Sequence, residues 1–339
     1  MISAVFKDTA GNILYNLYSN MEYGHKITSK IGYDIATMKV AKIKQTPLFL
    51  LNKIVHTYVR GAKVWEGYVE SIEINRNGYS ITYSIADMYN SIQAQYTDST
   101  TNENKILGAI SSSLHVDQYG TLQTVINAGT ASAYQASRAQ AAYLLNHQNV
   151  KIVQGGFSTE RSVTINCRGL FHKLNKVIYT NDLDSIQTVS GKIKDVLDSY
   201  TDLVFNTSVL TVNSVTVPTL EDQYRTAATI VNELIDIAGP DDERYYFGVY
   251  ENQNIEYGIL NEEVSYEKIP TANGFKVRNG NRYINPWHVR PDKIARIASF
   301  NGQAYEYITS VSYTAPYDLQ IEGAETDSIA GLLANLRGY

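Results

Sequence analysis

Six histidines and a single cysteine are the residues of this 339-residue chain best suited to bind a metal ion or act as a nucleophile. No two histidines have the HExxH spacing of a zinc protease, and one cysteine cannot form a zinc knuckle or an intrachain disulfide. Cys167 alternates with Val163 and Ile165, which predicts a buried thiol on the apolar face of a strand. The histidines are scattered along the chain as His25, His56, His115, His147, His172 and His288.

Two acidic clusters contain ligands of the kind that calcium prefers, but neither has the Asp-x-Asp-x-Asp-Gly spacing of a calcium loop. We expect both to be solvated turns. The chain has no GxSxG elbow and no GxxxxGK[ST] loop, and Gly155-Gly156 does not precede a helix. We therefore predict no catalytic, cofactor-binding or metal-binding residues, no cofactor and no enzymatic activity. The two clusters are Asp241-Asp242-Glu243 and Glu322, Glu325 and Asp327.

The two tryptophans are the side chains best suited to stack on a sugar. Trp65 lies in an alternating run, so we expect it to pack in the core. Trp287 follows Asn285-Pro286 and is expected in a loop, which makes it the better ligand candidate.

Composition favours a folded, β-rich protein with large contact surfaces. Hydrophobic residues make up 44% and charged residues 19% of the chain, and tyrosine, a strand former, occurs 27 times. The net charge of −5 is too small to indicate a nucleic-acid-binding protein. No apolar stretch approaches 18 residues, and the start has no signal-peptide core, so we expect no membrane span and synthesis in the cytoplasm.

Residues 64–98 and 150–181 follow a similar pattern, which we interpret as an internal repeat. Each copy is expected to be a strand pair that ends in a short helical turn. A duplicated β unit without catalytic residues indicates architecture, not chemistry. The aligned positions include Ile81 with Val163, Thr82 with Thr164, Met88 with Leu170 and Tyr89 with Phe171.

The predicted fold class is α+β, mainly β, with small barrels or sandwiches at both ends. Asn77-Gly78 between alternating runs favours a type I′ hairpin, and a second hairpin is expected across 251–253. Helices are expected at 102–114, 131–147, 190–200 (with Ser190 as N-cap), 221–238 and 326–336, and a loop at 261–285. The predicted units are 1–98, an N-terminal β-barrel; 99–149, a helical insertion or connector; 150–260, a second β unit with helices; and 261–339, a C-terminal β domain.

Three segments resemble strands of the tail hub and minor tail proteins of tailed phages, in the expected order. The segment VWEGYVESI at 64–72 resembles their WxGxVxxI strand, and RYYFGVYEN at 244–252 resembles their WYFGVxE hairpin. The segment VRPDKIARI at 289–297 resembles their RPGDxVRI strand. Asp292 stands where the family often has glycine.

The resemblance implies a baseplate or tail hub built from duplicated β-barrels related to the tail-tube subunit, with inserted helices and a small C-terminal barrel. Such a hub joins the tail tube to the tail tip and lets DNA pass. The expected assembly is a homotrimer whose two barrels per chain match a six-fold tube. Expected partners are the tail tube, the distal tail protein, the tape measure and tip or fibre proteins, with DNA only in transit, in the virion.

Two other functions remain open at this stage. A receptor- or carbohydrate-binding adaptor at the tail tip would use Trp287 or exposed tyrosines. A peptidoglycan hydrolase fused to a tail scaffold would need catalytic residues that the motifs above do not supply.

Overall fold

The computed structural model describes residues 1–325 apart from short gaps. The predicted helix at 326–336, the cluster Asp241-Asp242-Glu243, Asp327 and Asn77 lie outside the described residues. The gaps are 19, 44–46, 77, 181–187, 201, 208–209, 211–214, 217–223, 238–244, 260–263, 272–273, 280, 292–293, 300–301 and 316–317.

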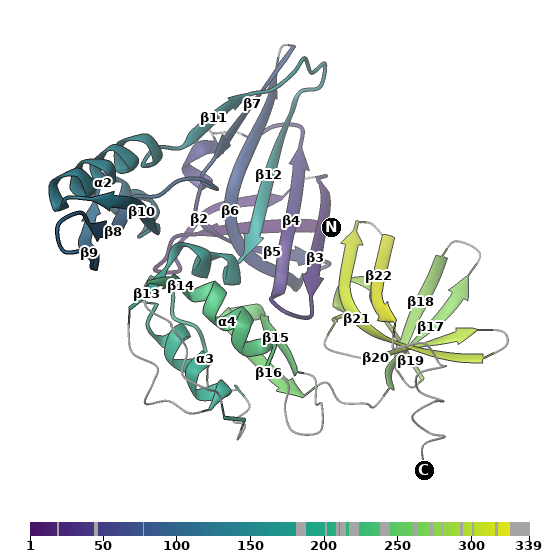
Figure 1. The fold of residues 1–339 in the computed structure, drawn as a ribbon. Helices are drawn as coiled ribbons and strands as arrows, with labels where there is room; N and C mark the ends of the chain where they lie inside the picture. Colours follow the sequence, from purple (N-terminus) through teal and green to yellow (C-terminus); the bar gives the residue numbers. More distant parts are fainter. Residues whose placement is uncertain are drawn as a thin grey trace.

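The expected α+β, mainly β architecture is confirmed, and the main core extends from an N-terminal body of antiparallel strands into the helices that follow it (Figure 1). Strands β6 and β7 form a hairpin in which Arg76 lies opposite Tyr79 and Gly78 has a φ of 91°. Only glycine adopts that conformation without strain. The strands of the body are β1 Ile2–Lys7, β2 Ile13–Tyr18, β3 Glu22–Thr28, β4 Gly32–Val40, β5 Ile54–Val59, β6 Ala62–Arg76, β7 Tyr79–Ser84, β11 Lys151–Gln154 and β12 Ser162–Gly169.

A separate lobe projects from the body between β7 and β11 (Figure 1). The helix predicted at 102–114 is wrong, because most of it is strand β9, which pairs with β8. Short apolar runs do not distinguish strand from helix, and Gly108 weakens the helical alternative. The helix predicted at 131–147 is confirmed, and Ser132 and Gln135 form its capping box. The lobe comprises β8 Ser91–Asp98, β9 Asn104–Ser111, α1 Ser113–Tyr119, β10 Gln123–Ala131 and α2 Ala133–His147.

Asn90 connects this lobe to the body and is fully buried. Its side chain donates to the carbonyl of Gly120 at 2.7 Å and accepts from the backbone N–H of Leu122 at 2.8 Å. Both backbone groups belong to the link between α1 and β10. A single amide therefore satisfies two buried backbone groups that have few alternatives.

Asn90→Ala is expected to lower the free energy of unfolding by about 3 kcal/mol, because two buried polar groups lose their partner at about 1–3 kcal/mol each. Urea denaturation followed by circular dichroism measures the change. Asn127→Ala, which removes an exposed acceptor for Gly129 N–H, is the matched control and should cost less than about 1 kcal/mol. Equal losses in the two variants would contradict this role of Asn90.

Two short helices pack on one another below the body. The helix predicted at 190–200 is confirmed, but its N-cap is Thr188, not Ser190, since the Thr188 hydroxyl accepts from Gly191 N–H. Ser190 lies inside the helix and is buried. The helix predicted at 221–238 is shorter than expected and is capped by Thr226. These elements are η2 Leu170–Lys176, β13 Ile178–Tyr179, α3 Val189–Asp198, β14 Arg225–Thr226 and α4 Ala227–Ile235.

The C-terminal unit consists of strands, and the loop predicted at 261–285 is wrong. Much of that segment forms antiparallel pairs, because its glycine and asparagine residues belong to hairpin turns between short strands. The hairpin across 251–253 is confirmed. Three elements precede this unit and pack against α4 and β4 (Figure 1): β15 Tyr245–Val249, η4 Glu251–Gln253 and β16 Ile255–Ile259. The C-terminal unit itself comprises β17 Val264–Thr271, β18 Gly274–Asn279, β19 Arg282–Ile284, η5 Pro286–His288, β20 Ile294–Ser299, β21 Gly302–Thr314 and β22 Asp318–Glu325.

One continuous row of eight strands joins the body to the C-terminal unit. The join is the antiparallel pairing of β3 with β21, from Thr28 opposite Ser310 to Gly24 opposite Thr314. Within the described residues, β11 and β22 each pair with only one strand and so form the two ends of the row. The order is β11-β7-β6-β12-β4-β3-β21-β22.

The repeat predicted at 64–98 and 150–181 is not a pair of similar units. In the first copy, β6 and β7 form a hairpin, but in the second β11 pairs with β7 and β12 pairs with β6 and β4. All four strands therefore belong to one sheet, and a boundary at residue 150 would divide it. The patterns match because β7 and β12 flank the same strand, which places Thr82 and Thr164 on either side of Glu73.

Candidate functional site

The residues considered for chemistry lie apart from one another. No three histidine, cysteine, aspartate or glutamate side chains within the described part of the chain are placed to share a metal ion. Cys167 is buried as predicted, and burial raises the pKa of its thiol. None of the described helices is both long and apolar enough to cross a bilayer.

Trp65 and Trp287 are both buried. Trp65 packs in the core as expected, at 0% exposure. Trp287 was expected in an exposed loop, but its exposure is only 5%, and its ring packs edge-on against Tyr313 with 6.0 Å between centroids. A short 3-10 turn begins at Pro286 and directs the indole inward. Trp287 therefore offers no exposed platform for a sugar.

The three segments that resemble phage tail strands meet at one buried junction. Glu66, whose side chain is 0% exposed, accepts from the backbone N–H of Asn252 at 2.9 Å and pairs with Lys63. Asn252 and Gln253 both have left-handed φ angles, near 60°. The carboxylate of Glu66 thus stabilises a strained turn that would otherwise cost about 1–3 kcal/mol. Residues far apart in sequence are held together by this contact.

Arg290 completes the junction from the third segment. Its guanidinium donates to Glu251 at 2.6 Å and to Glu256 at 2.9 Å, and lies 4.4 Å from the ring centroid of Tyr250. Tyr33 also donates to Glu251. Burial by itself raises the pKa of Glu251, but Arg290 and the Tyr33 hydroxyl outweigh it, so the pKa lies below its usual value. Glu251 and Arg290 are therefore both charged at neutral pH.

A hydrogen-bonded chain crosses the core beneath the sheet. The Nδ1 atom of His25 lies 2.9 Å from the Tyr23 hydroxyl, which lies 2.7 Å from Thr57 Oγ1. Thr57 donates in turn to the carbonyl of Trp65. Every donor is used once when His25 is neutral with its proton on Nδ1. Burial lowers the pKa of His25 to about 3.

This buried histidine predicts a loss of stability at acid pH. In the folded chain the pKa of His25 is about 3, against about 6.5 when unfolded. The stability is therefore complete above pH 6.5 and falls as the pH drops toward the folded pKa. Between pH 6.5 and 5 the loss from His25 is about 2 kcal/mol. Urea midpoints of wild type and His25→Asn measure it: the variant should have the flatter pH profile, and parallel profiles would contradict the assignment.

One face of the eight-strand row carries mostly polar side chains, although the partly exposed Ile35 and Val153 also lie on it. Residues directly opposite one another cross all eight strands without a large apolar side chain. Asn166 at the centre donates to Ser71 at 3.2 Å. The opposite face of the same strands holds the core, as alternation requires. The row runs Lys151, Ser84, Ser71, Asn166, Thr37, Gly24, Thr314 and Asp318. We call this surface the polar sheet face.

Each cation on the polar sheet face has a carboxylate partner. Lys39 lies 2.7 Å from Glu160, and the other three pairs are 3.0 to 3.3 Å apart. The affinity of a protein for DNA comes mainly from cations that neutralise phosphates and so release the counterions held by the DNA. Cations that already pair with carboxylates therefore bind DNA only weakly. The other pairs are Lys26 with Glu322, Arg168 with Glu70 and Lys151 with Asp87.

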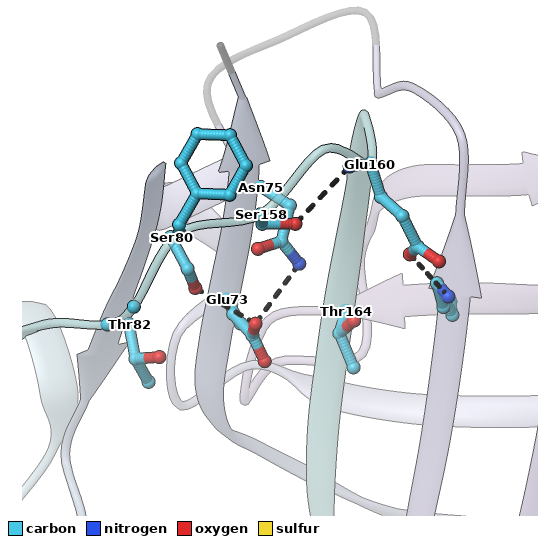
Figure 2. A pocket seen from close by; sticks show the side chains of 11 residues that line it. Glu73, Asn75, Ser80, Thr82, Ser158, Glu160 and Thr164 are labelled. Atoms are coloured by element: carbon cyan, nitrogen blue, oxygen red, sulfur yellow. Dashed lines mark hydrogen bonds and ion pairs between the residues drawn. The ribbon is translucent and has the colours of Figure 1, made fainter. Parts of the chain in front are cut away.

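A hollow of about 560 Å³ lies on this face beneath the 155–160 segment. Figure 2 shows Glu73 between Thr82 and Thr164, with Asn75 and Ser80 both donating to it, at 3.0 and 2.9 Å. The Ser80 bond links β7 to β6, and the Asn75 bond lies within β6. The hollow therefore continues the polar surface and adds no unpaired cation among the described residues.

No family model matches this chain, and no curated protein matches it. Among solved structures it is similar to a tail protein from Neisseria meningitidis (7% identity, TM-score 0.46, covering 92% of this chain and 91% of that one). It is also similar to the 43 kDa tail protein of prophage MuSo2 from Shewanella oneidensis (10% identity, TM-score 0.42, covering 96% and 98%). A type VI secretion component of E. coli, described as similar to T4 tail proteins, aligns at 9% identity and a TM-score of 0.44, covering 89% and 71%.

Proposed function

We propose that this chain is a structural protein of a phage tail: a hub ring that joins the tail tube to the tail tip and lets DNA pass. The observation that carries the proposal is the polar sheet face, which extends through the body and the C-terminal unit with each of its cations paired. Such a wall lets a polyanion slide without holding it. The chain performs no catalysis in this role.

The two ends of the eight-strand row supply the means of ring closure. An end strand exposes unpaired backbone groups and can pair with another chain. Both faces of β11 are exposed, including Ile152 at 65% and Val153 at 47%. Pairing of β11 with β22 of the next copy is a head-to-tail contact, which generates a closed ring when the rotation fits.

The dimensions of the row favour three copies. Neighbouring strands lie about 4.8 Å apart, so for strands parallel to the ring axis, 24 strands close with a diameter of about 37 Å. Short side chains leave enough room for duplex DNA, which is about 20 Å across. Sixteen strands close at about 24 Å and 48 strands at about 73 Å. A ring of two copies (16 strands) is thus too narrow for duplex DNA once its side chains are included, and a ring of six copies (48 strands) is far wider than duplex DNA.

The proposal also reassigns the two β units that a trimer needs to match a six-fold tube. They are the body and the C-terminal unit, since the segments 64–98 and 150–181 share one sheet. The proposed partners are the tail tube, the distal tail protein, the tape measure and tip or fibre proteins, in the virion. A sugar-binding adaptor could not use Trp287, which is buried, and would depend on exposed tyrosines such as Tyr18 and Tyr134.

Val153→Pro tests ring closure, because proline removes a backbone donor and is poorly tolerated within a strand that gains a second partner. Native mass spectrometry of the wild type should give three chains of 37.9 kDa. The variant should give single chains, whereas Val153→Thr should remain trimeric. A wild-type protein that stays a single chain, or a variant that still forms trimers, would contradict closure through this edge.

A further inference from the structure

A lysine and an asparagine that are far apart in the sequence meet in the interior of the protein. The Nζ atom of Lys173 donates to Oδ1 of Asn52 at 2.8 Å, across a separation of 121 positions in the chain. Both residues are buried, each at 7% exposure. Lys173 belongs to η2, and Asn52 lies just before β5. The contact therefore brings a primary amine and a side-chain amide together away from water.

The hydrogen bonds of Asn52 fix the direction in which its amide points. The amide nitrogen donates to the backbone carbonyl of Tyr119, and the amide oxygen accepts from Lys173. A carbonyl only accepts and a lysine ammonium only donates, so the reverse orientation would lose both bonds. The backbone of Asn52 has a left-handed φ of 60°, and its N–H donates to the carbonyl of Val69 at 2.9 Å. The amide is thus held with its carbonyl group against the amine.

The surroundings of the Lys173 amine favour its neutral form. Burial lowers the pKa of Lys173 to about 8, and the charge of Lys53 adds to this effect while that of Asp202 opposes it. About one chain in ten therefore has a neutral amine at pH 7. The ring of Tyr68 lies over the amine, with its centroid 4.7 Å from Nζ. A neutral, desolvated lysine amine is a nucleophile toward carbonyl carbon.

We propose that Lys173 and Asn52 form an intramolecular amide cross-link once the chain has folded. The Nζ atom attacks Cγ of Asn52, so that an Nζ–Cγ bond forms and the Cγ–Nδ2 bond breaks. One proton moves from Nζ to Nδ2, and this nitrogen leaves as ammonia. Holding the two groups in contact raises their effective concentration by many orders of magnitude, which makes an otherwise very slow reaction feasible. The proposal does not depend on the hub function.

A carboxylate beside the pair relays this proton. Asp202 accepts from the backbone N–H of Thr121 at 2.7 Å, two residues after the Tyr119 carbonyl that holds the Asn52 amide. The charge of Asp202 also acts on the Lys173 amine. Asp202 is therefore placed at the same short link of the chain as the reacting amide.

The mass of the intact folded protein tests the cross-link. Wild-type protein should be lighter than its sequence mass by about 17 Da, the mass of the lost ammonia. Lys173→Arg should have its full sequence mass, because arginine keeps a charge and a donor but is not a nucleophile. Asn52→Gly, which suits the left-handed backbone, should also have its full mass. A folded wild-type protein at its full sequence mass would overturn the proposal.

Lys176 provides the matched control. Burial lowers its pKa to about 8 as well, but its amine donates to the backbone carbonyls of Ala86 and Met88, which carry no amide nitrogen that can leave as ammonia. Lys176→Arg should therefore keep the loss of about 17 Da. Circular dichroism establishes that each variant is folded. Full mass in a folded Lys176→Arg would overturn the assignment to Lys173.

Tryptic digestion locates the bond. Succinimide formation at an Asn-Gly step such as Asn77-Gly78 also releases ammonia, but that loss would persist in Lys173→Arg. The cross-link should instead give one branched peptide that joins residues 45–53 to 169–176, with no cleavage after Lys173. A mass loss without this branched peptide would overturn the proposal.

Asp202→Asn tests the proton relay, because the new amide oxygen can still accept from the backbone N–H of Thr121. At least half of the chains of this variant should keep their full sequence mass. Complete cross-linking of Asp202→Asn would overturn the role of Asp202 as the relay.

Discussion

Arg290→Ala is expected to lower the free energy of unfolding by about 3 kcal/mol, the lower end of the range for removing one partner of a buried ion pair. The reason is that the charged Glu251 would lose its cation, and Glu251 and Glu256 would lose the guanidinium that bridges them. The side chains of Arg290 and Glu251 are each only 27% exposed, so water replaces the lost bonds incompletely. Denaturant titration measures the loss.

The control separates an unpaired charge from lost packing. A triple variant with Arg290→Met, Glu251→Gln and Glu256→Gln removes all three charges and keeps similar volumes. It should recover at least half of the lost stability, because replacing a buried ion cluster by neutral groups is often close to neutral. Two results would contradict this account of the junction. One is a loss of less than about 1 kcal/mol in the free energy of unfolding of Arg290→Ala. The other is a triple variant that is less stable than Arg290→Ala.

Placing new cations on the polar sheet face is expected to turn a weak DNA surface into a binding one. Thr37→Lys with Thr164→Lys adds two cations per chain, or six in a ring of three. At about 0.9 per neutralised phosphate, the slope of log affinity against log salt should steepen by up to about 5. Fluorescence anisotropy with a labelled duplex at several salt concentrations measures both affinity and slope.

The location of the added charge distinguishes a channel wall from any other surface. Ser137→Lys with Ala139→Lys adds the same charge at two exposed positions of α2. Lysines lining a channel should retain linear duplex but not closed circular DNA, which cannot thread through a ring. Lysines on α2 should retain both. Equal retention of circular DNA by the Thr37/Thr164 variant would mean that the polar sheet face is not a channel wall.

Local patterns predicted much of the secondary structure. The Asn77-Gly78 turn, the helix at 131–147 and the hairpin across 251–253 were read from signals that act over a few residues, and the structure contains all three elements. The two wrong predictions also arose from local patterns. The apolar spacing at 102–114 fits either a strand or a helix, and this segment is mostly strand. The glycine and asparagine residues at 261–285 predicted a loop, but they belong to turns between short strands.

The pairing of distant strands could not be read from the sequence. The similarity of 64–98 and 150–181 was real as a pattern, but it arises because β7 and β12 flank β6, so both must alternate in the same way. Neither the β3–β21 pairing nor the Arg290 contacts leave a signal in the sequence, because their partners are separated by long stretches of chain. The ion pairs on the polar sheet face could not be predicted either, because they depend on the register of the strands.

Electron cryomicroscopy of the assembled ring tests the central claim most directly. The account predicts three copies around the axis, with β11 of each copy against β22 of the next and with Asn166 and Thr37 facing a passage wide enough for duplex DNA. Six copies, or three copies whose polar sheet faces point away from the axis, would contradict it.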